Sequence, residues 1–278
     1  MADEAPRRRN TTLIMALIVI GVLFLCCCSL AVLGAALYPW VTEQRGPAGI
    51  LELPSGGGVE ATRELDRAFQ VPDGVVVVLD VRNQVGDIII EGTDDGQVIV
   101  EALVRAYGAT TADAERAADE VELEIEQQAD NRIRVIGRYR RDLAFQGRSP
   151  SVRFMIRLPR DATLQICSGV GRVEVSDVAG SATITSEVGD VIVREFAMDD
   201  DTRIEASVGR ILVELPADSA FVIDAETQVG DIDTEFEVRG AAPQRLPPGD
   251  RLQGEVGNAP QVELVLRTNT GDITIAAD

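Results

Sequence analysis

The sequence predicts an all-β fold, a right-handed β-solenoid-like stack of short strands with one short helix, preceded by a single transmembrane helix. A glycine-centred motif returns about every 20 residues, and apolar and polar residues alternate between its copies as in strands buried on one side. Fixed periods of this length indicate stacked supersecondary units that share one core. A β-sandwich of hairpins stays open as the alternative, because the same spacing of strands and turns suits it.

The repeated motif places a glycine before a charged residue and then a valine or isoleucine. Its glycines step by 18, 20 and 21 residues from Gly171 to Gly230, and the next step, to Gly271, is 41 residues, or two periods. Two segments, 248–252 and 256–258, are rival candidates for the copy that this double step lacks. The copies are Val85-Gly86-Asp87-Ile88, Gly169-Val170-Gly171-Arg172-Val173, Val188-Gly189-Asp190-Val191, Val208-Gly209-Arg210-Ile211, Val229-Gly230-Asp231-Ile232 and Thr270-Gly271-Asp272-Ile273.

The residue after the glycine alternates in charge along the chain. In a solenoid these residues stack at the strand spacing of about 4.8 Å. Arg172, Asp190, Arg210 and Asp231 are therefore expected on successive coils, where unlike neighbours contribute roughly 0.2–1 kcal/mol per pair. This ladder would help to fix the register, and it disfavours a row of calcium sites, which needs acids on successive coils. The glycine suits the turn because it accepts positive φ and close approach of a neighbouring coil.

The first part of the folded region is expected to contain strands and one helix. Thr110 and Asp113 fit a capping box, and a run of alanines after them favours helix. β-branched runs and apolar–polar alternation indicate the strands. The expected strands are Val75–Val81, Ile88–Ile90, Val98–Val104, Val121–Glu126 and Ile133–Tyr139, and the expected helix is Thr110–Glu120.

The N-terminal region predicts a membrane anchor. The run from Leu13 to Leu37 is 25 residues long without a charge, enough to cross a hydrocarbon core of about 30 Å. Arginines 7–9 precede it, so the N-terminus is expected in the cytoplasm. The predicted parts are a cytoplasmic tail (1–12), a single-pass transmembrane helix (13–38), a Pro/Gly-rich stalk (39–70) and an extracytoplasmic β-repeat domain (71–278). A cleaved signal peptide, processed at residues 34–36, is the alternative.

Composition excludes several classes of chemistry. The chain has no histidine and all 26 of its basic residues are arginine, so histidine bases and ligands, Schiff-base lysines and P-loop lysines are absent. No catalytic, cofactor-binding or metal-binding residue is predicted. The net charge of −20 disfavours nucleic acid as a partner. Cys167, the one cysteine after residue 28, is expected to be buried.

A basic cluster at residues 132–141 stands out in this acidic chain. It is the local candidate for binding an anionic ligand or a sugar acid, although a solvated strand face is the more common role of such charges. Glu187 and Asp190 are candidate acids of a β-helix carbohydrase, but acids at repeat turns are ordinary turn residues. An enzyme is therefore not predicted.

The segment from Leu158 to Glu195 resembles the bacterial putative-adhesin family of β-strand-repeat proteins. Pro159, Ala162 and Leu164 match the Pro-x-x-Ala-x-Leu pattern of that family's first strand, and the Gly-Asp-Val/Ile turns follow. The resemblance extends over about residues 71–278 and implies a surface-exposed repeat domain without catalytic residues. The chain departs from the family in carrying Arg172 and Arg210 where aspartate is usual.

These observations predict a non-enzymatic binding or scaffold module at the bacterial cell envelope. The alternative is an accessory regulator of a membrane signalling system that responds to envelope stress. The expected partners are the lipid bilayer, through residues 13–38, and an envelope polymer or a membrane protein. Because the last strand, Ile273–Ile275, has no capping element after it, homo-association through the solenoid ends is also expected.

Overall fold

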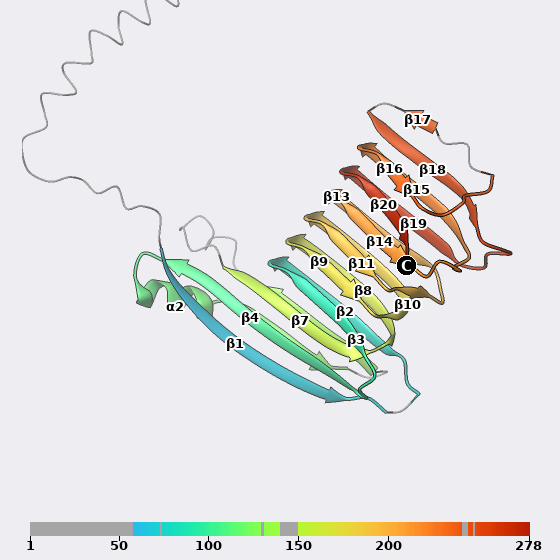
Figure 1. The fold of residues 1–278 in the computed structure, drawn as a ribbon. Coiled ribbons are helices and arrows are strands. Elements are labelled where there is room, and N and C mark those ends of the chain that lie inside the picture. The colour runs from blue at the N-terminus through green and yellow to red at the C-terminus, as the bar shows by residue number, and fades with distance from the viewer. Residues whose placement is uncertain (1–57, 73, 129–130, 140–149, 241–243, 247) are drawn as a thin grey trace, which may run out of the picture. The chain divides into compact units, whose positions relative to one another are not determined.

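Two β-sheets that enclose one apolar core make up most of the described chain (Figure 1). The computed structural model describes residues 58–72, 74–128, 131–139, 150–240, 244–246 and 248–278, which belong to one compact unit, Gly58–Asp278. Within these ranges no helix is long and apolar enough to cross a membrane. The predicted cytoplasmic tail and transmembrane helix lie outside the described residues.

Sheet A has nine strands and sheet B has eleven. In spatial order, sheet A contains β1 (Val59–Gln70), β4 (Gln97–Gly108), β7 (Ser151–Pro159), β3 (Ile88–Thr93), β9 (Val173–Ser176), β11 (Val191–Arg194), β14 (Ile211–Leu215), β20 (Ile273–Ala277) and β16 (Ile232–Thr234). Sheet B contains β17 (Gln244–Leu246), β18 (Gly249–Val256), β15 (Phe221–Val229), β19 (Glu263–Thr270), β13 (Thr202–Val208), β10 (Ala179–Val188), β8 (Asp161–Val170), β2 (Val77–Val85), β6 (Arg132–Arg138) and β5 (Glu122–Gln127), with β12 (Ala197–Met198) beside β10.

Six coils form the repeat, and each runs from a strand of sheet B through a glycine turn into a strand of sheet A. In spatial order they are β2–β3, β8–β9, β10–β11, β13–β14, β19–β20 and β15–β16. Neighbouring coils pair in parallel in both sheets, as Val188 with Val170 and Val191 with Val173 illustrate. Within these coils, consecutive strands thus lie in opposite sheets rather than in hairpins, which confirms the solenoid over the sandwich.

The last coil of the chain is not the last coil of the stack. Strand β20 lies between β14 and β16, so that Ile273 pairs with Ile211 on one side and Ile232 on the other. Figure 1 shows the red C-terminal strands among the other coils rather than at the end. The prediction of an open edge at Ile273–Ile275 is therefore wrong, because coil β15–β16 pairs with that edge.

Residues between β16 and β19 make an antiparallel excursion. Strand β18 pairs with β15, and β17 pairs with β18, so both cover the end of sheet B. Neither 248–252 nor 256–258 forms a coil turn; they lie at the two ends of β18. The prediction of an extra repeat copy in this interval is wrong.

The folded unit begins earlier than the expected boundary at Val71. Strand β1 occupies 12 residues of the predicted stalk and pairs along its whole length with β4 in antiparallel register. Leu65 and Phe69 on β1 pack against the core, and these apolar contacts make a stalk over residues 59–70 incorrect. Helix α2 (Thr111–Asp119) packs against β1 and β4. Its N-cap is confirmed, since the Asp113 N–H donates to Thr110 Oγ1 at 3.2 Å.

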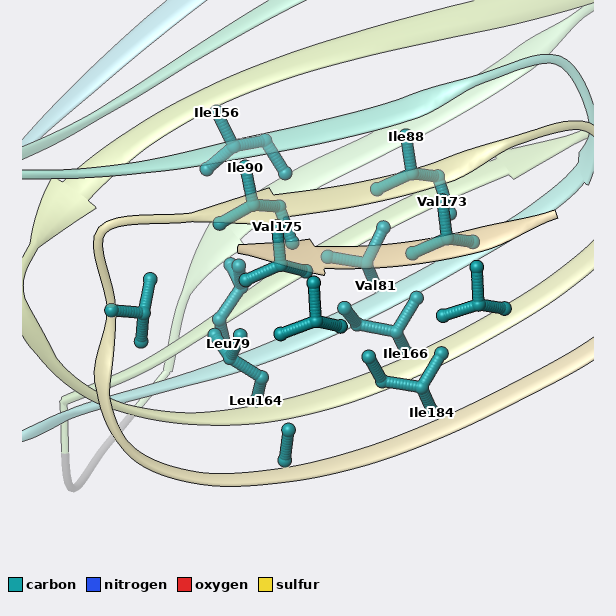
Figure 2. Close-up of a cluster of buried hydrophobic side chains, with 14 of the residues drawn as sticks. Leu79, Val81, Ile88, Ile90, Ile156, Leu164, Ile166, Val173, Val175 and Ile184 are labelled. Atoms are coloured by element: carbon teal, nitrogen blue, oxygen red, sulfur yellow. The ribbon is translucent and has the colours of Figure 1, made fainter. Parts of the chain in front are cut away.

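The core follows from strict alternation along each strand. Figure 2 shows Val81, Ile166 and Ile184 from three neighbouring strands of sheet B facing Ile88 and Val173 from sheet A. All five side chains are at most 1% exposed. Such a column of branched side chains supplies the burial that no single coil achieves alone.

Cys167 lies on the outer face of sheet B and is exposed, so its predicted burial is wrong. Its neighbours Ile166 and Ser168 point inward, and strand alternation then turns Cys167 outward. Within the described ranges, no group of three or more acidic or cysteine side chains is placed to hold a metal ion.

Candidate binding surfaces

The six glycine turns stack into a column, here called the glycine corner. Each of these glycines has φ between +121° and +147°, and a Cβ added to it would lie 2.0–2.2 Å from a carbonyl oxygen of the neighbouring chain segment. Glycine is needed for both reasons, which confirms the role expected from the repeat. The column runs in the spatial order Gly86, Gly171, Gly189, Gly209, Gly271 and Gly230.

A column of small polar side chains lies beneath the glycine corner, and the sequence reasoning missed it. The Thr227 and Thr268 hydroxyls donate to the carbonyl oxygens of Gly271 and Gly209, at 2.8 and 3.2 Å. Such bonds satisfy buried turn carbonyls that the sheets leave unpaired. The signal was present, because a hydroxyl or amide side chain precedes the glycine by three residues in five of the six copies: Asn83, Ser168, Ser186, Thr227 and Thr268.

Charged residues that follow the glycines form the predicted ladder along the corner. The Arg210 backbone N–H donates to Asp190 Oδ1, and its guanidinium donates to Asp190 Oδ2, both at 3.0 Å. Arg172 lies on the coil before Asp190, so the alternation is confirmed for these three. It is wrong for Asp231, which neighbours Asp272 because the last coil is inserted there. In spatial order the charge ladder is Asp87, Arg172, Asp190, Arg210, Asp272 and Asp231.

The ladder makes stability depend on pH through Asp190. The pKa of Asp190 lies below its ordinary value, mainly because the carboxylate accepts a hydrogen bond from the Arg210 backbone N–H. The Arg210 guanidinium lowers this pKa further. Because the pKa is lower in the folded state, the contribution of Asp190 to the free energy of unfolding is complete above its unfolded pKa of about 3.9. This contribution is lost as the pH falls through the folded pKa. We expect Asp190→Asn to flatten the fall in unfolding free energy below about pH 4, measured by urea denaturation. Arg210→Gln keeps the backbone donor and should keep most of that fall; an unchanged profile for Asp190→Asn would contradict the assignment.

A row of valines lies beside the glycines on the side of sheet B and is called the valine ridge. Val170, Val188, Val208 and Val229 are each 46–49% exposed and account for four of the eight exposed large apolar residues of the described chain. Parallel pairing places one ridge residue on each coil. In spatial order the ridge is Val85, Val170, Val188, Val208, Thr270 and Val229.

The outer face of sheet B is hollowed where β6, β2, β8 and β10 approach the corner. This groove, called the arginine groove, has a volume of about 630 Å³ and is lined by Arg82, Arg134, Arg138 and Tyr139, among others. Cys167, Thr185 and Glu187 continue the lining towards β10. Residues of strands far apart in the sequence meet here because β2 pairs with both β6 and β8.

Each arginine of the arginine groove has a carboxylate partner within the chain, and Arg82 binds Asp80 at 3.2 Å. Glu124 is shared between Arg134, at 3.5 Å, and Arg138, at 2.9 Å. The Nε atom of Arg134 is buried without a hydrogen-bond partner among the described residues. One carboxylate accepts fewer bonds than two guanidiniums donate, so donors remain for an anionic ligand.

The predicted basic cluster is thus only partly the site. Arg134 and Arg138 line the arginine groove, whereas Arg132 donates to Gln165 at 3.0 Å, and residues 140–141 lie outside the described ranges. Sequence reasoning missed Arg82, which reaches the groove only through the pairing of β2 with β6. The two candidate acids are not brought together as a pair: Glu187 lines the groove, whereas Asp190 is bound by Arg210 across the turn.

The chain matches the Toastrack DUF4097 family over residues 70–276. A solved structure of a "putative cell adhesion protein" from Clostridium sporogenes is similar to it at 15% identity and a TM-score of 0.54, covering 78% of this chain and 100% of that one. A "putative adhesin" from Bacteroides fragilis is similar at 13% identity and a TM-score of 0.29, covering 77% and 97%. No curated protein matches the chain. Since the family match covers most of the sequence and nearly all of the two sheets, the chain belongs to the Toastrack DUF4097 family.

Proposed function

We propose that this chain is a membrane-anchored, non-enzymatic binding module of the bacterial cell envelope that holds an anionic envelope polymer in the arginine groove. The observation that carries the proposal is the gathering of Arg82, Arg134 and Arg138 around one groove, where Arg134 and Arg138 share one carboxylate and Arg82 has Asp80 as its partner. The name of the Clostridium sporogenes structure, a "putative cell adhesion protein", supports a binding role for this fold.

The chemistry of the groove suits carboxylate or phosphate groups spaced along a chain. Arginine presents a planar fork of donors that fits either anion with two parallel hydrogen bonds. Tyr139 adds an aromatic side chain at the same groove, against which the apolar face of a sugar ring can pack. The groove is open along the outer face of sheet B, so an internal segment of an extended polymer can bind there and no chain end is needed.

The acidic surface limits the binding of an anionic polymer to the arginine groove. A net charge of −20 repels a polyanion from most of the molecule, so attraction is confined to the arginine groove. Such a surface contributes to specificity and to the on-rate more than to affinity.

The predicted helix at residues 13–38 would anchor the module. The uncharged run, with arginines before it and Tyr38 and Trp40 after it, supports a single pass with the β domain outside the cytoplasm. Proteolysis of intact cells tests this orientation: cleavage of the β domain by added protease is expected, whereas full protection in intact cells would contradict it.

Retention on immobilised polymers tests the binding. The full chain in detergent micelles is expected to bind a polyuronate or a phosphate-linked polyol polymer and to pass through a neutral glucan. The triple variant Arg82→Gln/Arg134→Gln/Arg138→Gln should bind about tenfold or more weakly, because the loss of one charged hydrogen bond, about 1.5–3 kcal/mol, already weakens binding by this factor. The matched control Arg105→Gln/Arg157→Gln/Arg203→Gln loses the same charge elsewhere and should bind as the parent chain does. Equal weakening in both triples, or no retention of the parent chain, would contradict the proposal.

A further inference from the structure

We propose that the valine ridge, with the charge ladder beside it, is a self-association face on which a second copy of this chain docks in antiparallel orientation. The valine ridge borders the arginine groove, because Val85 and Val170 also line that groove, but the proposal is argued from other observations than the polymer site. It rests on the exposure of the valines, on the order of the charges that the inserted coil creates, and on the near absence of charge on the other flank.

The valine ridge is an apolar strip that Thr270 interrupts between Val208 and Val229. Its four most exposed valines lie on coils β8–β9, β10–β11, β13–β14 and β15–β16, one residue before the turn glycine. Coils repeat at the strand spacing of about 4.8 Å, so the side chains are in line. Contiguous exposed apolar strips bordered by polar residues mark interaction sites more often than scattered single valines do.

An antiparallel copy matches this strip column for column. Suppose that the twofold axis crosses the ridge at right angles, between the coils of Val188 and Val208. The valine ridge of one copy then faces the valine ridge of the other in reverse order, and the two charge ladders face each other in the same way. Val188 then faces Val208 of the second copy, and Val170 faces Thr270. A parallel copy would instead set the charge ladder against the uncharged flank, so charge complementarity favours the antiparallel arrangement.

The charge ladder is self-complementary in that register. Asp190 faces Arg210 of the second copy and Arg172 faces Asp272, and each pair occurs twice by symmetry. Around the axis, two Asp190 and two Arg210 side chains form a square of alternating charge. This extends the ion pair that each copy already makes at 3.0 Å.

The outer positions do not oppose this arrangement strongly. Asp87 faces Asp231 of the second copy, but Asp87 is already paired with Arg153 at 3.2 Å within its own chain. On the other flank of the ridge, the residues two before each glycine are uncharged except for Glu187, which faces Ser207 of the second copy. These flank residues are Gln84, Gly169, Glu187, Ser207, Asn269 and Gln228.

The contact along one corner of six coils buries less area than a standard interface, which buries about 1,200–2,000 Å². Association is therefore expected in the weak class, with a Kd between about 10 μM and 1 mM. Confinement of the chain to a membrane would raise its effective concentration and favour the dimer.

Analytical ultracentrifugation of the full chain in detergent micelles tests the association up to about 1 mM. We expect a reversible monomer–dimer equilibrium whose Kd rises at least about tenfold in Val188→Lys, because a buried unpaired ammonium would replace the central apolar contact. Val76→Lys is the matched control, since Val76 is 53% exposed and lies outside the ridge, and its Kd should equal that of the parent chain. A chain that stays monomeric over the whole range, or equal effects of the two lysines, would overturn the proposal.

Disulfide crosslinking tests the register in a Cys26→Ala/Cys27→Ala/Cys28→Ala/Cys167→Ser background. Val188→Cys lies next to the axis and should form dimers on mild oxidation. Val170→Cys should not crosslink with itself, but should crosslink with a separate chain that carries Thr270→Cys. Efficient dimers of Val170→Cys alone would indicate parallel docking and overturn the antiparallel arrangement, and the unfolding midpoint of each variant shows whether it is folded.

Discussion

Replacing Gly209 with alanine is expected to lower the free energy of unfolding by more than about 4 kcal/mol, enough to unfold a domain of ordinary stability. Its Cβ would lie 2.1 Å from the carbonyl oxygen of Gly189, and its φ of +147° is disfavoured for every residue with a side chain. The neighbouring atom is backbone and is held by pairing in both sheets, so it cannot move aside without separating two coils.

Alanine substitutions at two other glycines distinguish the cost of the positive φ from the cost of the steric clash. Gly96 has no positive φ, and a Cβ at that position would have only the Val71 carbonyl oxygen nearby, at 3.8 Å, so Gly96→Ala should be nearly neutral. Gly74 has a φ of +74° but open space around it, so Gly74→Ala should cost about 1 kcal/mol from the backbone alone. Urea denaturation of the three variants gives the comparison. Equal effects of Gly209→Ala and Gly74→Ala would contradict close stacking of the turns.

Shortening Ile273 to alanine is expected to cost about 2–5 kcal/mol, although Ile273 lies close to the end of the sequence. Its side chain is 0% exposed, because coils β13–β14 and β15–β16 pack on both sides of it. Ile232→Ala is the matched control: Ile232 occupies the same motif position on the outermost coil and is only partly buried, so its cost should be clearly smaller.

Truncation after Val262 should have a still larger effect for the same reason. Removing residues 263–278 takes away β19 and β20, the interior strands that join coil β13–β14 to coil β15–β16. We expect loss of the cooperative unfolding transition in circular dichroism. If the coils were stacked in sequence order, the deletion would only shorten the stack, and a truncated chain of near-parent stability would contradict the inserted coil.

The repeat could be predicted from the sequence because its causes are local. Glycine at each turn, alternation along each strand and the N-cap at Thr110 depend on residues close together in the chain, and the structure confirms them. The order of the last two coils could not be predicted, since Gly230-Asp231-Ile232 and Gly271-Asp272-Ile273 carry the same motif. Only the long-range excursion through β18 decides which of them neighbours Arg210.

The binding surfaces were predictable to different extents. The basic cluster was visible because Arg132, Arg134 and Arg138 are close in sequence, whereas Arg82 required the pairing of β2 with β6. Strand β1 was missed because charged residues occupy half of its exposed positions and hide the spacing of Leu65 and Phe69. Such charges protect an edge strand from unwanted pairing, which is a property of the folded sheet rather than of the local sequence.

The arginine groove contains its own reporter, the exposed thiol of Cys167. The most direct measurement is the rate at which a maleimide alkylates Cys167 in the Cys26→Ala/Cys27→Ala/Cys28→Ala chain as an anionic polymer is added. We expect the polyuronate or phosphate-linked polymer retained by the chain to slow alkylation with saturation, and Arg82→Gln/Arg134→Gln/Arg138→Gln to remove this protection. An unchanged rate at polymer concentrations that retain the chain would place the polymer elsewhere and contradict the groove as its binding site.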